Sequence, residues 1–417
     1  MAQVALIGGI RTPYVKMGNA FKDLTADDLG ASVVKELLNR FNLGGREIDE
    51  VIIGNVSQPA EAANVARVIA LRAGLPKSVS AYTVHRNCAS GLQAIADGYD
   101  KIALGLADIV IAGGVESMSN IPFLYGKELR ELVAGIMSAK TMSAKIKLLA
   151  GLKLKYLKPV VGLLAGLSDP LIGMNMGQTA EVLAETYDIS RKEQDEFALA
   201  SHQKAEAAIK SGRLKREIMT MFLADKNAVV NEDIGPRFGQ TMEALTKLKP
   251  VFKKPHGTVT AGNSSQITDG AAAVLMMSKD AAKALGFETD VRVYGYAFAG
   301  CEPKTMGLGP VYATQKLFNR DGWRLDQMLR VEINEAFAAQ VLACLRVFEE
   351  EGMGAVNPDI LNVNGGAIAL GHPVGSSGTR LVLTLMNELR LNDLTGPALA
   401  TLCIGGGQGG AMVIMRQ

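Results

Sequence analysis

Short apolar runs that end in or near glycine alternate along this chain with stretches long enough to form helices. Three of these runs lie in the first third of the sequence: VALIGG at 4–9, VIIGNV at 51–56 and DIVIAGG at 108–114. Residues 87–105 place Leu92, Ile95 and Ile102 at three- and four-residue steps, the spacing of an amphipathic helix. Buried strands beside helices of this length predict an α/β protein with covered sheets.

The C-terminal third repeats this arrangement. Its segments are VRVYGYAF at 291–298, RVEINEAF at 330–337, GGAIALGHPVGSSGTR at 365–380 and TLCIGGGQGGAMVIM at 401–415. In each half, a turn of small residues carries a reactive side chain into a helix: Cys88 in the first half and His372 in the second. The pattern predicts a duplicated α/β unit.

Composition restricts the class of protein. At 417 residues the chain is long enough for two or more hydrophobic cores. With 48% apolar and 21% charged residues it is compact and globular, which excludes disordered, collagen-like and coiled-coil proteins. A formal net charge of +2 gives the whole chain no attraction to nucleic acid. Residues 394–415 are uncharged, but Pro397 and the glycines among them favour two strands around a turn over a membrane helix.

The cysteines and the N-terminus indicate a compartment. Four cysteines, Cys88, Cys301, Cys344 and Cys403, are scattered without a CxxC pair, so we expect neither a disulfide framework nor a metal site. Free thiols indicate a reducing compartment. The N-terminal MAQVALIGGIRTP lacks a basic region and predicts a first strand rather than a signal peptide. We therefore expect a cytoplasmic protein.

Two helical regions lie between the halves. Residues 127–158 carry eight basic and two acidic residues among Leu, Ile and Met, which predicts one or two amphipathic helices. This segment is either the solvated basic face of a lid or a hairpin that docks on a membrane surface or a partner. Residues 189–212 predict a helix pair in which Ser190 and Glu193 form a capping box. We interpret His202 as an ordinary residue of these surface helices.

Cys88 is the first candidate for chemistry. It lies in HRNCASG, directly before the periodic helix, where free N–H groups and the helix dipole favour a thiolate. We therefore expect its pKa to lie below the ordinary value of about 8.5. Its small neighbours leave the sulfur open to a substrate, although a buried, inert cysteine fits this motif equally well.

Three other positions carry reactive or polar groups beside glycines or at an element boundary. His372 lies among glycines that indicate close backbone approach or tight packing, although a histidine that caps a turn is the alternative. Cys403 precedes GGGQGG, which suits proton transfer and an oxyanion site. Gly405, Gly407 and Gly410 in this run also form the GxGxxG pattern of dinucleotide-binding sites, but too few residues follow it to complete such a site. Asn334, with Glu335, lies between a strand and a helix and could hold a water, although helix capping is the simpler role.

Together these segments resemble the thiolase family, acetyl-CoA C-acyltransferases that act on 3-ketoacyl-CoA. The resemblance runs in order through GGIRTP, NCASG, GGVESMS, MGQTAE, KPHGTVTAGNSSQITDGAAA, GLGPVYATQK, NEAFAAQ, GGAIALGHPVGSSGTR and CIGGGQG. It implies two βαβαβαββ halves in a five-layered αβαβα sandwich with an inserted loop domain. The implied domains are 1–121 with 257–286, the loop domain 122–256, and 287–417. The basic insertion is most similar to β subunits of trifunctional fatty-acid oxidation complexes.

The resemblance also implies a role for each candidate. Cys88 corresponds to the acyl-carrying nucleophile, His372 to its base and Cys403 to the second acid/base. Asn334 would hold a water that forms one oxyanion site with His372, and the N–H groups of Cys88 and Gly405 would form the other. Coenzyme A is then a co-substrate rather than a permanently bound cofactor, and the positions that correspond to its binding residues are Arg237 and Ser265.

The implied activity is cleavage of 3-ketoacyl-CoA in fatty-acid β-oxidation, and the alternative is a short-chain acetoacetyl-CoA thiolase that condenses two acetyl-CoA. A ketoacyl synthase would not need the second thiol, Cys403. The implied partners are a second copy in a homodimer or tetramer and a hydratase/dehydrogenase α subunit. The basic segment at 127–158 adds a peripheral membrane contact as a further candidate. The sequence departs from the family pattern at Asn175, where many thiolases have histidine, and Asn334 is histidine in trifunctional β subunits.

Overall fold

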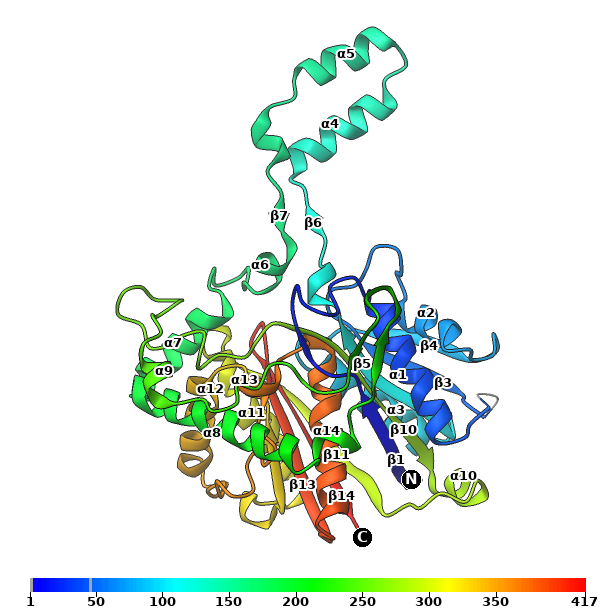
Figure 1. Ribbon diagram of the computed structural model, residues 1–417, viewed down its shortest axis with the longest axis vertical. Helices are drawn as coiled ribbons and strands as arrows, with labels where there is room; N and C mark the ends of the chain where they lie inside the picture. Colours follow the sequence, from blue (N-terminus) through cyan, green and yellow to red (C-terminus); the bar gives the residue numbers. More distant parts are fainter. Residues whose placement is uncertain (1–2, 45–46) are drawn as a thin grey trace.

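The computed structural model describes residues 3–44 and 47–417, so residues 1–2 and 45–46 of the predicted N-terminal domain lie outside it. Its two halves repeat one order of elements (Figure 1). The first half contains β1 (Val4–Arg11), α1 (Ala26–Arg40), β3 (Glu50–Gly54), α2 (Val65–Arg72), β4 (Ser80–Val84), α3 (Ser90–Ala103), β5 (Ile109–Glu116) and β10 (Thr268–Ser278). The second contains β11 (Val291–Gly300), α11 (Gly309–Asp321), β12 (Arg330–Ile333), α12 (Ala338–Glu350), α13 (Ala367–Leu370), α14 (Val374–Leu391), β13 (Gly396–Ile404) and β14 (Gln408–Arg416).

The strands follow the same pattern in both halves. In the first half the order is β4-β3-β5-β10-β1, with β3 parallel to β4 and β5, and β10 antiparallel to its neighbours. The second half has the order β12-β13-β14-β11, and a parallel bridge between Val331 and Leu361 lies where β4 lies in the first half. In the described chain, β1 and β11 are paired at Ala5 and Arg292, and this contact joins the two sheets edge to edge. The predicted duplication is confirmed.

The three largest hydrophobic cores of the described chain lie between the layers. On β3, Ile52 packs into a core with α3 and α14, whereas Val51 and Ile53 pack on the opposite face with α1 and α2. On β13, Leu402 points into that same middle core and Leu399 into an outer core with α11 and α12. Because side chains alternate across a strand, each sheet is covered on both faces. The result is α, β, α, β, α, as expected, with α3 and α14 as the middle layer.

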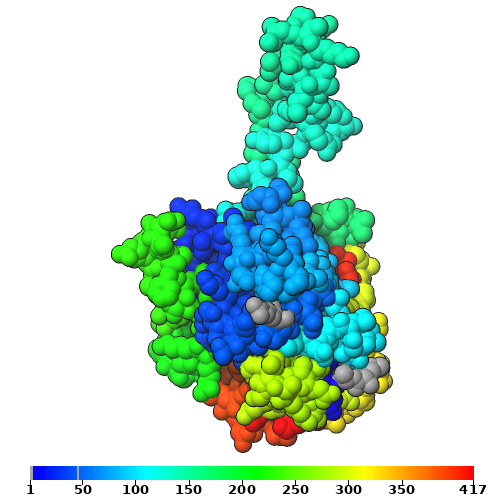
Figure 2. Space-filling view, turned by 90° about the vertical axis from the view of Figure 1, so that its right-hand side faces the viewer, coloured from blue at the N-terminus to red at the C-terminus, as the bar shows by residue number. Residues whose placement is uncertain are grey.

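A long insertion separates β5 from β10 and has two parts. Its first part is a ribbon of β6 (Phe123–Leu124) and β7 (Val160–Val161) that carries α4 (Lys127–Ser138) and α5 (Met142–Ala150) away from the body (Figures 1 and 2). The predicted amphipathic helices are therefore confirmed, and neither buries a residue. The second part contains α6 (Gly162–Gly166), α7 (Met176–Thr186), α8 (Arg191–Lys210), β8 (Met221–Leu223), β9 (Ala228–Val230) and α9 (Met242–Thr246).

Two expectations for the second part are corrected. The predicted helix pair is one continuous helix, α8, because no glycine or proline interrupts residues 191–210. Its capping box of Ser190 and Glu193 is confirmed. His202 is buried at 3% exposure rather than on the surface, because α8 packs against α12 and α13.

The uncharged C-terminal segment forms the predicted pair of strands. Strands β13 and β14 are antiparallel and are joined by a turn at Gly405–Gly407. Among the residues described, no helix combines the length and the apolar character that crossing a bilayer requires.

Candidate active site

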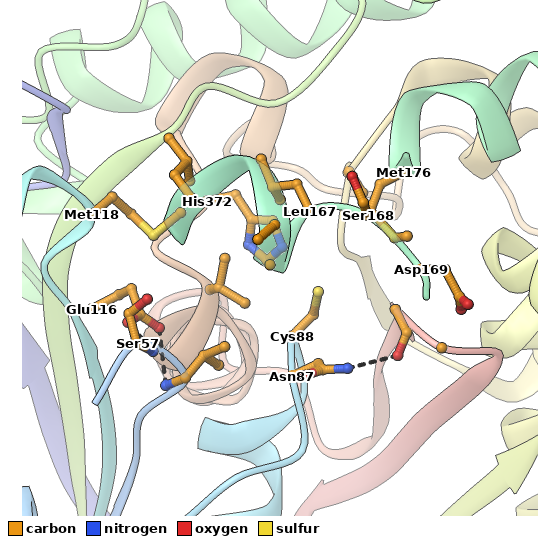
Figure 3. A pocket seen from close by; sticks show the side chains of 18 of the residues that line it. Ser57, Asn87, Cys88, Glu116, Met118, Leu167, Ser168, Asp169, Met176 and His372 are labelled. Atoms are coloured by element: carbon orange, nitrogen blue, oxygen red, sulfur yellow. Dashed lines mark hydrogen bonds between the residues drawn. The ribbon is translucent and has the colours of Figure 1, made fainter. Parts of the chain in front are cut away.

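Two helix N-termini meet at the end of the middle layer and bring the predicted residues together. Cys88 lies just before α3 and His372 just before α14, and these two helices pack against each other. Both residues line a cavity of about 350 Å³ (Figure 3). Cys403 and Gly405, at the end of β13, line the same cavity. The four residues therefore come from three segments and from both halves of the fold.

Glycines allow this close approach. A Cβ on Gly114 of β5 would lie 1.9 Å from the carbonyl oxygen of Gly375 in the first turn of α14. A Cβ on Gly378 of α14 would lie 2.5 Å from the backbone nitrogen of Leu92 in α3. Contacts this short exclude any side chain, so glycine at these positions lets α14 reach both β5 and α3.

Cys88 differs from its sequence prediction in its acidity. Burial raises the pKa of the Cys88 thiol, against the lowering effect of hydrogen bonds from the backbone of Gly405 and of Cys88 itself. The expected depressed pKa is therefore wrong. The helix begins only at Ser90, and loss of hydration outweighs the dipole and the two N–H groups. A thiol in this environment needs a nearby base to become a nucleophile.

His372 is oriented to be that base. Its Nδ1 lies 2.5 Å from Ser377 Oγ, and that hydroxyl lies 3.0 Å from the carbonyl oxygen of Pro373. A carbonyl oxygen only accepts, so the hydroxyl donates to it and accepts the Nδ1 proton. Nε2 is then unprotonated. Burial and the Arg380 charge lower the pKa of His372 to about 4, which keeps the imidazole neutral near pH 7.

Asn334 lies on the other side of the imidazole. Its Nδ2 is 3.5 Å from His372 Nε2, which agrees with a proton-free Nε2. Asn334 is fully buried, and its Oδ1 has no hydrogen-bond partner among the described residues. A buried amide oxygen without a partner costs free energy unless a water or ligand satisfies it.

Glu335, beside Asn334, has a structural role. Its carboxylate accepts hydrogen bonds from Ser201 Oγ, Asn362 Nδ2 and the backbone N–H of Ile368. These contacts tie the loop after β12 to α8 and α13. Because its oxygens are occupied in this way, Glu335 holds Asn334 in place and does not face the cavity.

Cys403 is a protonated thiol in this environment. Its side chain is 1% exposed, and burial, followed by the nearby Cys88, raises the pKa of Cys403 well above the ordinary value. A thiol that keeps its proton beside a second thiol can donate that proton to a carbanion formed between them.

The two positions that correspond to coenzyme A contacts differ in location. Ser265 lines the cavity. Arg237 is exposed, lies outside the lining as far as the described chain shows, and donates its backbone N–H to His202 Nδ1 at 3.2 Å. The structure thus brings Ser265 to the reactive residues and leaves Arg237 on the surface.

Sequence reasoning missed two features of the cavity. The first is Glu116 at the end of β5, which is fully buried and accepts backbone N–H bonds from Val56, Ser57 and Gly375. Burial raises the pKa of this carboxyl to about 7, against those bonds. A lone glutamate that ends an apolar strand in GGVES was the available signal. It ties α14 to the loop after β3.

The second missed feature is the roof of the cavity. Residues 162–170, which contain α6 and follow directly from β7, line the cavity together with Met118 and Ile121 at the other leg of the projecting ribbon. Leu163 and Leu167 make this roof largely apolar. No local pattern in the sequence connects this segment with Cys88.

Comparison with known proteins assigns both halves to one family. Residues 4–280 match the family model "Thiolase, N-terminal domain" and residues 287–416 match "Thiolase, C-terminal domain". The chain is 43% identical to the acetyl-CoA acetyltransferase of Pseudomonas aeruginosa, with all of both chains covered. It is 41% identical to the 3-ketoacyl-CoA thiolase of Pseudoalteromonas translucida, over 99% of this chain and 96% of that protein.

Solved structures agree in fold. The acetyl-CoA acetyltransferase of Bacillus anthracis superposes with a TM-score of 0.90 at 37% identity, over 100% of this chain and 99% of that chain. Human mitochondrial 3-ketoacyl-CoA thiolase in complex with CoA has a TM-score of 0.88 at 37% identity, over 100% of this chain and 98% of that chain.

Proposed function

This chain belongs to the thiolase family, and from that membership we infer that it is an acetyl-CoA C-acyltransferase that cleaves 3-ketoacyl-CoA with CoA. The observation that carries the inference is the meeting of Cys88, His372 and Cys403 in one cavity. The products are acetyl-CoA and an acyl-CoA shortened by two carbons, and the reaction belongs to fatty-acid β-oxidation. CoA is a substrate.

The first half-reaction forms a thioester on Cys88. His372 Nε2 takes the thiol proton, and the sulfur attacks C3 of the substrate. The C2–C3 bond then breaks, the acyl group stays on the sulfur, and the enolate of acetyl-CoA takes a proton at C2 from Cys403. In the second half-reaction Cys403 takes the proton of CoA, whose sulfur attacks the acyl thioester and releases Cys88, and the Cys88 thiolate takes its proton back from His372.

Two oxyanions form in this scheme, at different places. The oxygen on C3 would accept from the N–H groups of Cys88 and Gly405, which already approach the sulfur. The thioester enolate oxygen would accept from protonated His372 and from a water on Asn334, whose free Oδ1 supports that role. Each such donor contributes roughly 3–4 kcal/mol to transition-state stabilisation.

The apolar roof supports a substrate with an acyl chain. Met118, Ile121, Leu163 and Leu167 give the cavity a wall that can cover methylene groups. Each buried CH₂ contributes about 0.8 kcal/mol, so a chain in this wall strengthens binding with length. Ser265 and the exposed Arg237 are our candidates for the pantetheine and nucleotide parts of CoA.

The test is CoA-dependent cleavage of 3-ketoacyl-CoAs from four to sixteen carbons by purified protein. Cys88→Ala is expected to abolish it, whereas Cys301→Ala, a free thiol outside the cavity lining, serves as the matched control. Activity that rises with chain length supports β-oxidation, and activity confined to four carbons supports acetoacetyl-CoA as the substrate. A folded protein without cleavage at any length contradicts the proposal.

We further propose that the projecting hairpin, residues 127–158, docks on an anionic membrane surface. It carries eight basic and two acidic residues. Met142, Ile146 and Leu149 form an exposed apolar stripe on α5, and the same helix carries Lys145 and Lys147. Basic side chains bind anionic lipid headgroups, and apolar side chains beside them enter the interface of the bilayer.

Sedimentation with phosphatidylglycerol vesicles tests this docking. We expect the protein to bind them, to bind phosphatidylcholine vesicles weakly, and to lose binding in Lys145→Glu/Lys147→Glu. Absence of binding to anionic vesicles contradicts the proposal and would direct attention to an α subunit as the partner. We also propose that the protein is cytoplasmic and forms a homodimer or tetramer. Sedimentation velocity tests the oligomeric state.

A further inference from the structure

The residue before the proposed nucleophile has an uncommon backbone conformation. Asn87 has a φ of 42°, in the left-handed region that side chains other than that of glycine seldom adopt. Asparagine tolerates this region better than most residues. The conformation turns the chain between β4 and α3, places Cys88 in the cavity, and directs the Asn87 amide across it toward β13 (Figure 3).

That amide binds the second half of the fold. Asn87 Nδ2 donates to the carbonyl oxygen of Gly405 at 2.7 Å (Figure 3). Gly405 lines the same cavity as Cys88, and its backbone N–H lowers the pKa of the Cys88 thiol against the larger effect of burial. Cys88 and the N–H that faces its sulfur are thus connected through one side chain.

The segment held by this bond would otherwise be free to turn. Gly405 is followed by Gly406 and Gly407, with φ values of 91° and 82°, and three consecutive glycines have wide conformational freedom. Arg86, also before the nucleophile, reaches the same turn by donating to Gln408 Oε1 at 3.3 Å, a longer bond at the far end. Asn87 is the contact made at Gly405 itself.

We propose that Asn87 is a positioning residue that holds the Gly405 N–H against the reactive sulfur and so keeps an oxyanion donor in place. The inference rests on the proposed function for its effect on catalysis. Its effect on the thiol does not depend on any substrate. An asparagine suits the task because its backbone accepts the left-handed turn and its short amide presents a donor to a carbonyl oxygen.

Three variants separate the amide from the backbone. Asn87→Gly keeps the turn and removes the amide, whereas Asn87→Ala removes the amide and adds strain. Asn87→Asp replaces the donor by a carboxylate that faces the carbonyl oxygen of Gly405. Asn42→Ala, at an exposed asparagine with a φ of 50°, is the matched control for strain far from the cavity.

Two readouts test the proposal. Loss of a whole oxyanion donor lowers kcat by about 10²–10³-fold, so a loosened one should lower kcat by roughly 10- to 100-fold in Asn87→Gly with little change in KM for CoA. The rate of Cys88 alkylation by iodoacetamide at pH 7 should fall by about 3- to 10-fold, since a weakened hydrogen bond disfavours the thiolate. Asn87→Asp should lower both kcat and the alkylation rate relative to the parent protein. Asn42→Ala should match the parent protein in both assays.

Wild-type kcat and wild-type alkylation in Asn87→Gly overturn the proposal. The proposal is also overturned if Asn87→Ala loses both kcat and melting temperature while Asn87→Gly keeps wild-type values of both. That result would assign Asn87 a role in stability alone. If the parent protein cleaves no 3-ketoacyl-CoA, the proposed function fails, and the alkylation profile still decides the role of Asn87.

Discussion

Replacing Ser377 by alanine should impair the proposed base while leaving the fold intact. In the present structure Ser377 Oγ accepts the Nδ1 proton of His372 at 2.5 Å, which leaves Nε2 free to take a proton. Without this hydroxyl, a buried N–H has no acceptor, which costs about 1–3 kcal/mol. The imidazole can avoid that cost by moving the proton to Nε2, and it then cannot act as a base toward Cys88.

The magnitude follows from this choice between tautomers. A bias of 1–3 kcal/mol corresponds to roughly a 5- to 150-fold change in the population of the reactive form. We expect kcat of thiolysis in Ser377→Ala to fall within that range. Acylation of Cys88 by 3-ketoacyl-CoA, followed as a burst, should slow by the same factor, because the proton transfer belongs to that step.

The neighbouring serine provides a matched control. Ser376 is equally buried on the same helix, but its Oγ lies 2.7 Å from Tyr14 Oη and does not bond His372 in the described structure. Ser376→Ala therefore loses one buried hydrogen bond without a change in the base. If both variants lose activity in equal measure, the effect is one of packing, and the argument from the tautomer is refuted.

Three other substitutions test the burial described above. Burial and the nearby Arg237 charge lower the pKa of His202 to about 4. As pH falls from about 6.5 toward 4, this histidine is protonated in the unfolded chain but not in the folded one, so the folded state loses stability. His202→Asn should therefore reduce the difference in urea-unfolding free energy between pH 7 and pH 5 by about 2 kcal/mol. Arg380 forms a buried ion pair with Glu332, so Arg380→Met leaves that carboxylate buried without its partner and should lower the unfolding free energy by about 3–5 kcal/mol. Lys127→Met, which removes the exposed pair with Glu131, should lower it by less than about 1 kcal/mol. Gly114→Ala should lower both the melting temperature and kcat, since its Cβ would overlap a carbonyl oxygen of α14, while Gly44→Ala, which meets nothing within 4 Å, should do neither.

Local patterns in the sequence predicted the elements well. The first strand, the helix after Cys88, the two helices of the insertion and the capping box at Ser190 all depend on residues close in sequence. Spacing and capping chemistry determine such features before any tertiary contact forms. The order of motifs also brought together Cys88, His372, Cys403, Gly405 and Ser265, which line one cavity. Two other predicted residues lie outside that lining: Asn334 is buried beside His372, and Arg237 lies on the surface. The domain boundaries stay a prediction.

Burial could not be predicted from local patterns, and it caused the errors. The pKa of Cys88 was expected to be low from the helix dipole, but desolvation by distant segments raises it. His202 was placed on the surface, yet α8 carries it under other helices. Glu116 gave no periodic signal because its importance lies in three backbone N–H groups from two other segments. Each of these depends on contacts between residues far apart in sequence.

The middle layer explains why a duplicated fold can build one site from two halves. Helices α3 and α14 occupy equivalent places in the two halves, so their N-termini meet only if the helices touch closely along their length. Gly91 of α3 permits this, because a Cβ there would lie 2.5 Å from Thr379 Oγ1 of α14. Reacting atoms must approach to about 3–3.5 Å. A methyl group inserted between the two helices would push them apart and move the sulfur and the imidazole out of that range. The glycines beside Cys88 and His372 therefore act through helix packing, which sets the distance between the sulfur and the imidazole.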